Sequence, residues 1–123
     1  MIGKAYVSTF QFYDTLSKKM SFKNRPVLIV GRADAGDYVV LPISRVTNQN
    51  NLDSKYDVLL EPKAVPLMNL KQRSYIRTHK QAVINAGGLT KEIVDFKKEY
   101  PGIYATAISR MADFQKILAQ NAL

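Results

Sequence analysis

The feature that most constrains the fold is the aliphatic run Val27-Leu28-Ile29-Val30, which directly follows Arg25-Pro26. The run is far shorter than the ~20 apolar residues that span a bilayer. It is apolar on both alternating faces, which is typical of a strand buried on two sides. Proline at the first position of a strand removes no hydrogen-bond donor from the centre of the ladder. The run therefore predicts a buried strand that begins at Pro26.

Four other segments have the composition of strands. Residues 4–13 are rich in aromatic and β-branched types, and residues 38–44 follow the turn-forming residues 33–37, which predicts a hairpin with the buried strand. Residues 56–61 predict a fourth strand. Residues 74–84 alternate between an apolar face and a polar, aromatic face, which predicts a fifth.

Two further segments predict a loop and a pair of helices. Residues 14–24 are polar and basic without a sustained period, which predicts a long loop and a candidate binding loop. After Gly87-Gly88 the pattern becomes helical, with Thr90 as the N-cap of a helix that ends at Tyr100. Apolar residues then recur three and four apart over residues 103–118, a stripe suited to core packing or a dimer seam.

A chain of 123 residues is the size of one domain. Together, the segments predict a single α+β domain over residues 1–123. A small barrel of about five mostly antiparallel strands occupies about residues 1–86, and two C-terminal helices occupy about residues 89–121.

The charge is unevenly distributed along the chain. There are 18 Lys and Arg against 10 Asp and Glu, a net charge of +8. Residues 15–33 hold five basic residues and no acid, and residues 62–91 hold six and no acid. Such stretches can form one positive face, which favours an anionic partner and nucleic acid first. A solvated surface that only confers solubility is the alternative.

Several classes of enzyme lack their motifs in this chain. With no cysteine and a single histidine, His79, the chain has neither a thiolate zinc site nor a histidine pair. It has no Gly-x-Ser-x-Gly and no phosphate-binding glycine loop, so we expect no cofactor. A metal-independent ribonuclease remains open, because RNA supplies its own nucleophile, the 2′-hydroxyl. Without a signal-like or membrane-spanning run, we expect a cytoplasmic protein.

Three motifs follow one another along the chain: Asn24-Arg25-Pro26-Val27-Leu28-Ile29-Val30, Val40-Leu41-Pro42-Ile43-Ser44 and Ser74-Tyr75-Ile76-Arg77-Thr78-His79-Lys80. With the helical C-terminus, they resemble the MazF/PemK toxins of type II toxin–antitoxin systems over about residues 3–118. The resemblance implies an SH3-like barrel that forms a homodimer and is silenced by a cognate antitoxin protein. It also implies metal-independent, sequence-selective cleavage of single-stranded RNA, including mRNA, with 2′,3′-cyclic phosphate ends.

The resemblance also implies site residues. It assigns the catalytic arginine to Arg25 and the catalytic hydroxyl to Ser44. His79 is the reserve candidate for acid or base, because its ordinary pKa is near neutrality. The candidate RNA-binding residues are Lys18, Lys19, Ser21, Lys23, Tyr75, Arg77 and Lys80.

Other readings of the residues stay open. Many members of the family have a glycine-rich loop with an acid before the arginine, whereas residues 17–23 here contain neither. The mechanism and the recognised RNA sequence therefore stay undetermined. A non-catalytic RNA-binding module on the same barrel is one alternative, and a gyrase-poisoning relative of the same fold is another.

Overall fold

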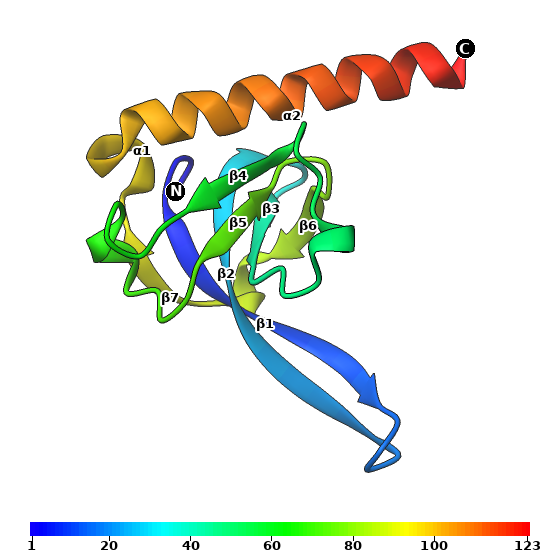
Figure 1. The fold of residues 1–123 in the computed structure, drawn as a ribbon. Coiled ribbons are helices and arrows are strands. Elements are labelled where there is room, and N and C mark those ends of the chain that lie inside the picture. Colours follow the sequence, from blue (N-terminus) through cyan, green and yellow to red (C-terminus); the bar gives the residue numbers. More distant parts are fainter.

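The computed structural model describes residues 1–123, apart from the side chains of Phe10 and Phe12. The strands are β1 (Ala5–Asp14), β2 (Lys19–Arg32), β3 (Asp37–Ser44), β4 (Asp57–Leu60), β5 (Ser74–Arg77), β6 (Ala82–Asn85) and β7 (Leu89–Val94). The helices are α1 (Phe96–Glu99) and α2 (Pro101–Ala122), and three short 3-10 turns are η1 (Gln49–Asn51), η2 (Pro66–Met68) and η3 (Ala86–Gly88). The predicted α+β class is confirmed (Figure 1).

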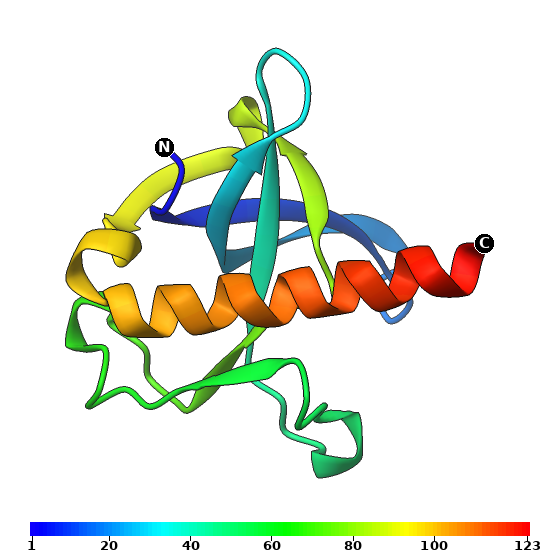
Figure 2. The same cartoon turned by 90° about the horizontal axis from the view of Figure 1, so that it is seen from above.

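One mostly antiparallel, curled sheet forms the body of the protein. Its strand order is β4-β5-β3-β2-β1-β7, and β6 pairs with β3 beside this path. Within the described chain the end strands β4 and β7 form no ladder, so the curled sheet stays open. Helix α2 crosses one side of the sheet, as Figures 1 and 2 show from two directions. Over residues 1–123 the sheet has seven strands, more than the five that the sequence predicts.

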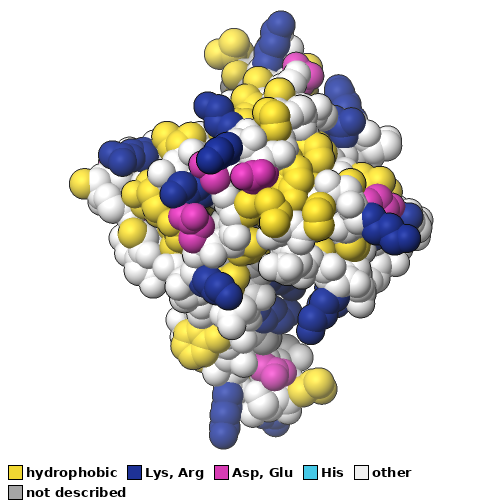
Figure 3. Space-filling model, turned by 90° about the vertical axis from the view of Figure 1, so that its left-hand side faces the viewer, with side chains coloured by type: hydrophobic (Ala, Val, Ile, Leu, Met, Phe, Trp, Pro, Cys, Tyr) yellow, Lys and Arg dark blue, Asp and Glu magenta, His cyan; other side chains and the backbone are white. Residues whose placement is uncertain are grey.

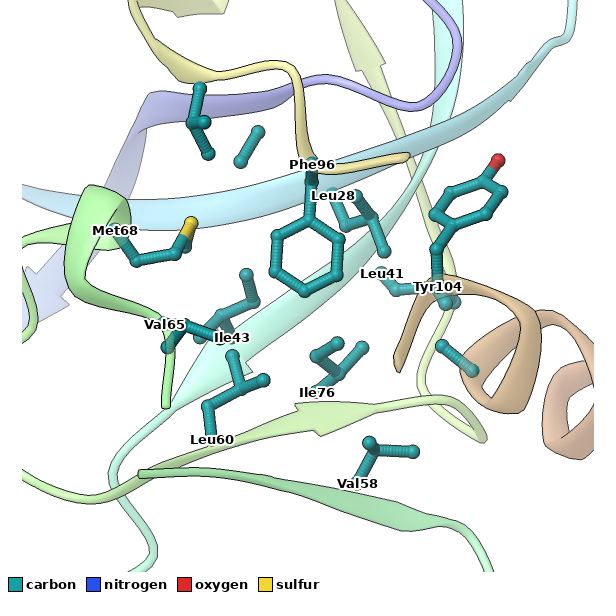
Figure 4. Close-up of a cluster of buried hydrophobic side chains, with 13 residues drawn as sticks. Leu28, Leu41, Ile43, Val58, Leu60, Val65, Met68, Ile76, Phe96 and Tyr104 are labelled. Carbon is teal, nitrogen blue, oxygen red and sulfur yellow. The ribbon is translucent and has the colours of Figure 1, made fainter. Parts of the chain in front are cut away.

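The inner half of β2 is buried on both faces, as its sequence predicts. Val27 and Ile29 pack with Val40 of β3 on one face. Leu28 and Leu41 belong to the larger cluster on the other face, where Phe96 of α1 fills the centre (Figure 4). All six side chains are 0% exposed. This two-sided burial is what makes β2 and β3 the centre of the fold.

The predicted loop over residues 14–24 is wrong. These residues form the tip and the outer half of a long hairpin, in which β1 and β2 pair from Ala5↔Leu28 out to Asp14↔Lys19. The Asp14 carboxylate accepts hydrogen bonds from the backbone N–H groups of Leu16 and Ser17, and Lys18 adopts a left-handed φ of 56°, which closes the turn. We call residues 9–24 the arm, because they project from the body (Figure 1).

The predicted strand over residues 74–84 is interrupted. β5 pairs with the end of β3, and β6 pairs with its beginning. Residues 78–81 between them turn away, and the Thr78 hydroxyl is buried against the backbone carbonyl of Tyr56 at 2.6 Å. The alternating pattern correctly predicted a strand for each half of the segment, but it could not indicate the break between them.

The predicted helix from Thr90 to Tyr100 is also wrong, and only its last turn is helical. Residues 89–94 are strand β7, paired with β1, and the N-cap is Asp95, whose carboxylate accepts from the N–H of Lys98. Thr90 instead donates its hydroxyl to the carbonyl of Val7 on the neighbouring strand. The C-terminus therefore holds one long helix and a single turn, in place of two long helices.

Helix α2 confirms the predicted apolar stripe in its first half. Tyr104 and Ala107 are buried in the core, and Phe114 packs edge-on against Tyr56 with ring centroids 5.2 Å apart. Farther along, Leu118 is 56% exposed, where the helix extends past the body (Figure 2).

The core makes a prediction about Phe96. Replacing Phe96 by Ala should lower the free energy of unfolding by about 3–5 kcal/mol, because it leaves a cavity in the larger cluster. Urea denaturation measures this change. Leu16→Ala is the control, since Leu16 is 95% exposed at the tip of the arm and should change stability by less than about 0.5 kcal/mol. Equal effects of the two substitutions would contradict the assignment of the core.

Candidate functional site

Arg25 and Ser44 lie at corresponding positions of neighbouring strands. The ladder between β2 and β3 ends at Val27↔Pro42. Arg25 and Ser44 each lie two residues beyond this last pair, just past the end of the ladder. Ser44 is half-buried and pairs with Tyr75 of β5. Arg25 thus lies on β2 where the pairing with β3 has just ended, and Ser44 lies at the corresponding end of β3.

The side chain of Arg25 is exposed and, among the described residues, has no hydrogen-bond or ion-pair partner. A guanidinium is a planar fork of donors that matches the geometry of a phosphate. An exposed, unpaired Arg can therefore bind a phosphate and stabilise added negative charge on its oxygens.

Basic residues of the arm form a row that continues outward along β2 from Arg25. Lys19, Ser21 and Lys23 precede Arg25 at intervals of two residues, so they share its face of the strand. Lys18 lies in the turn at the tip. Figure 3 shows Lys and Arg side chains over the lower, protruding part of the molecule, which is the arm. Four of the predicted RNA-binding residues thus follow one another toward Arg25.

The other predicted binding residues are less accessible. Tyr75 is 8% exposed, which leaves little of its ring for stacking. Arg77 donates from Nε to Oδ1 of the buried Asp57 at 2.6 Å and from a terminal nitrogen to the carbonyl of Asn51 at 3.0 Å. The guanidinium of Arg77 is therefore largely occupied in holding β5 against β4 and against η1, which precedes β4.

His79 lies in the turn after β5, against helix α2. Its ring is 5.7 Å from the ring of Tyr56 and 6.1 Å from that of Phe114, measured between centroids. Its Nδ1 is buried without a hydrogen-bond partner among the described residues and lies 3.8 Å from Oδ1 of Asp57. Burial lowers the pKa of His79 below 6.5, against the opposing effect of Asp57. The imidazole is therefore neutral at pH 7.

A second cluster surrounds an open cavity of about 630 Å³ beside His79. The lining residues are Asn50, Asn51, Leu52, Asp53, Ser54, Arg77, His79 and Lys80. The candidate residues thus divide into two groups. Arg25 and Ser44 lie on the sheet at the base of the arm, whereas Arg77, His79 and Lys80 surround this polar cavity.

Sequence reasoning missed Asp57, which organises the second cluster. Its side chain is 1% exposed and binds Arg77, and its Oδ2 accepts from the backbone N–H of Asp53 at 2.8 Å. Arg110 of α2 donates to its backbone carbonyl. Its only sequence signal is a carboxylate at the start of a predicted strand. Sequence reasoning also did not single out Arg45, an exposed basic residue directly after Ser44, because it lies outside both basic stretches.

The described residues contain no group of three His, Cys, Asp or Glu side chains that could hold a metal ion. No helix in the described part of the chain is long and apolar enough to cross a membrane.

No model of a known protein family matches this sequence, and no curated protein matches it. The structure, however, resembles that of the Mycobacterium tuberculosis toxin MazF-mt6, with a TM-score of 0.58 and 20% sequence identity. The match covers 89% of this chain and 96% of that chain. The chain therefore has the MazF fold, as the three sequence motifs predict.

The buried ion pair makes a prediction about stability. Asp57→Asn should lower the free energy of unfolding by about 3–5 kcal/mol, because it leaves the nearly buried guanidinium of Arg77 without a counter-charge. Urea denaturation checks it. Glu61→Gln is the matched control: it breaks the exposed Arg73–Glu61 pair and should change stability by less than about 1 kcal/mol. A loss of less than about 1 kcal/mol in Asp57→Asn would contradict the structural role of the pair.

The lowered pKa of His79 makes a prediction about pH. The unfolded chain binds a proton near pH 6.5, whereas the folded chain does so only at a lower pH. The free energy of unfolding should therefore fall as the pH drops below about 6.5, and level off below the folded pKa. Urea denaturation of wild type and of His79→Gln over pH 5–8 isolates the contribution of His79 to the free energy of unfolding. If the difference between the two proteins did not vary with pH, the neutral buried state of His79 would be wrong.

Proposed function

We propose that this chain is the toxin of a type II toxin–antitoxin pair and cleaves single-stranded RNA, such as mRNA, without a metal ion. The observation that carries the proposal is Arg25 in a MazF fold: its side chain is exposed, has no partner among the described residues, and lies just past the end of the β2–β3 ladder, as Ser44 does on β3. The sequence resemblance assigns the catalytic arginine and the catalytic hydroxyl to these two residues. The basic row of the arm, which leads to them, supports a long anionic substrate.

The proposed reaction uses a nucleophile that the substrate brings. The 2′-oxygen of one ribose attacks the adjacent phosphorus and forms a new P–O bond, while the bond from phosphorus to the 5′-oxygen breaks. The products are a 2′,3′-cyclic phosphate and a free 5′-hydroxyl. One proton leaves the 2′-hydroxyl and another reaches the 5′-oxygen. Negative charge accumulates on the non-bridging oxygens in between, where preorganised donors accelerate the reaction most.

Each candidate residue has a role that fits its surroundings. Arg25 stabilises the charge on the phosphate, since a guanidinium with a pKa above ~12 is a poor base. Ser44 donates its hydroxyl to a non-bridging oxygen. His79 is the candidate for proton transfer, because its neutral imidazole can accept a proton at pH 7. Lys18, Lys19, Ser21 and Lys23 bind the phosphates of the RNA, and Lys80 contacts the RNA from the side of β5. Tyr75 and Arg77, which are largely buried or engaged, support the backbone of β5 there.

The proposal includes the other properties implied by the resemblance. The protein acts in the cytoplasm as a homodimer, and a cognate antitoxin protein silences it. The exposed end of α2, with Ile117 40% and Leu118 56% exposed, is an apolar surface that a dimer could cover.

The test is cleavage of a long, weakly structured RNA in EDTA. Wild type should yield discrete products with 2′,3′-cyclic phosphate ends. Arg25→Ala should lower the rate by about 10²–10³-fold, the loss typical of removing one donor to the transition state. Arg32→Ala is the matched control, because Arg32 lies on the same strand but its guanidinium packs over Tyr38. Ser44→Ala should also lower the cleavage rate. His79→Gln should lose the acidic limb of the pH–rate profile, because a general base is inactivated by protonation at low pH.

Other outcomes would select other functions. Saturable RNA binding without products would favour a non-catalytic module. Inhibition of a topoisomerase with intact RNA would favour the gyrase-poisoning branch. Equal losses in Arg25→Ala and Arg32→Ala would remove Arg25 from the site.

A further inference from the structure

The end of the arm carries a cluster of exposed apolar side chains. Tyr13 is 57% exposed, Leu16 95%, Met20 53% and Phe22 67%. Tyr13 and Met20 are opposite each other in the β1–β2 ladder, and Phe22 follows on the same face of β2. Leu16 lies in the turn between the two strands. We call these four residues the apolar tip, and a cluster of this kind in solvent marks an interaction surface.

Lysines surround the apolar tip. Lys18 lies in the turn, and Lys19 and Lys23 lie on the other face of β2, all three with exposed side chains. Asp14 is the only acid of the arm, and its carboxylate accepts two N–H groups of the turn. Figure 3 shows basic and hydrophobic side chains together on the protruding end of the molecule. The tip therefore suits a partner that is both anionic and apolar.

The backbone of the arm limits how deeply it can enter an apolar phase. β3 pairs with β2 only over residues 27–32, and β7 pairs with β1 only over residues 5–8, so both outer edges of the arm are open in the described sheet. Hydrocarbon does not tolerate unpaired N–H and C=O groups. At ~3.3 Å per residue, the turn and two or three residues of each strand fill the about 5–10 Å of an interfacial layer. The arm can thus enter the surface of a bilayer but not its centre.

The chemistry of the tip selects a lipid surface among the partners. A second copy would bring the same lysines and a net charge of +8. The four partly exposed side chains also fall short of the ~800 Å² per partner that a stable protein interface buries. RNA would bind the lysines, but Leu16 and Met20 are aliphatic and have no ring on which a base stacks. A bilayer supplies anionic phosphates with an apolar layer beneath them, and it moulds around a projecting tip.

We infer that the apolar tip docks the protein, end-on, on an anionic lipid surface. Leu16, Met20 and Tyr13 enter the boundary between the headgroups and the acyl chains, and Phe22 contacts the same boundary from the apolar face of the arm. Lys18 and Lys19 extend their long side chains to the lipid phosphates. The body stays outside the bilayer, with α2 on the side of the body away from the arm (Figure 1).

The probe is a set of vesicles made of phosphatidylcholine and phosphatidylserine at about three to one, with vesicles of phosphatidylcholine alone for comparison. The full chain should sediment with the anionic vesicles at low salt and bind the neutral ones about tenfold or more weakly. Leu16→Ser should weaken binding to the anionic vesicles by about tenfold or more. Val83→Ser is the matched control, because Val83 is 59% exposed on β6, away from the arm, and should bind like wild type.

A pair of charge reversals separates the arm from the general charge of the protein. Lys19→Glu should weaken binding to the anionic vesicles by about tenfold. Lys63→Glu makes the same change in net charge at an exposed residue after β4, a strand on the far side of the body from the arm (Figure 1). Lys63→Glu should therefore bind nearly as well as wild type.

Fluorescence locates the tip in the bilayer, because the chain contains no Trp of its own. In Leu16→Trp the emission should shift to shorter wavelength on anionic vesicles and be quenched by brominated acyl chains. Val83→Trp should show neither change.

Several results would overturn the inference. They are no sedimentation of wild type with anionic vesicles, equal affinities of Leu16→Ser and wild type, equal losses in the two charge reversals, or no quenching in Leu16→Trp. Self-association of the free protein that Leu16→Ser abolishes would assign the tip to a second copy. Loss of RNA affinity in Leu16→Ser, with vesicle affinity unchanged, would assign it to RNA.

Docking also has a consequence that rests on the proposed function. Lys18 and Lys19 are residues that the proposed function assigns to the phosphates of RNA, so lipid and RNA should compete for the arm. If the free protein cleaves RNA, saturating anionic vesicles should slow cleavage by wild type far more than cleavage by Leu16→Ser. Unchanged cleavage by vesicle-bound protein would overturn the competition. If the free protein does not cleave, the proposed function fails, while sedimentation and fluorescence still decide the docking.

Discussion

The structure depends on the burial of the inner half of β2 on both of its faces. Val27 and Ile29 are buried by residues packed on one face of the sheet, and Leu28 is buried by residues packed on the other. Burying such side chains contributes about 1.5–3 kcal/mol each, so the rest of the chain is arranged around them. β6 contributes to the smaller cluster, β4, β5 and α1 contribute to the larger one, and β7 contributes to both. Helix α2 then closes the second side.

The same strand changes its character at Pro26. Inward of this residue, β2 is a central strand, and outward it is half of a two-stranded ribbon in solvent. An isolated hairpin is only marginally stable in water, so the arm depends on its continuity with the buried half. Arg25 lies at this transition, where a rigid core positions a side chain that solvent and a substrate can still reach. The proposed chemistry uses that combination of a fixed backbone and an open face.

The parts that the sequence predicted have strong local patterns. Val27–Val30 is apolar at every position, and residues 103–118 repeat their apolar side chains at helical spacing, so β2 and α2 were predicted correctly in type. The segments whose secondary structure was predicted wrongly have weak hydrophobic patterns. Residues 14–24 and 89–94 are polar enough to suggest a loop and a helix, but pairing with β1 made them strands. A neighbouring strand satisfies backbone hydrogen bonds whatever the polarity of the side chains, and tertiary context overrides propensity of this size.

For the candidate site, the motifs singled out Arg25, Ser44 and His79, but gave no sign that they fall into two groups. The sequence by itself determined the apolar strands, the long C-terminal helix and the concentrated positive charge, because each of these is a property of residues close together in the chain. Only the tertiary structure decided that Arg25 and Ser44 both lie just past the end of the β2–β3 ladder, that Asp57 holds Arg77 beside His79, and that the outer edge of β2 is open. Those relations join residues about 20 positions apart, and they are set by strand register and by the path of the turns, which no local pattern of side chains specifies.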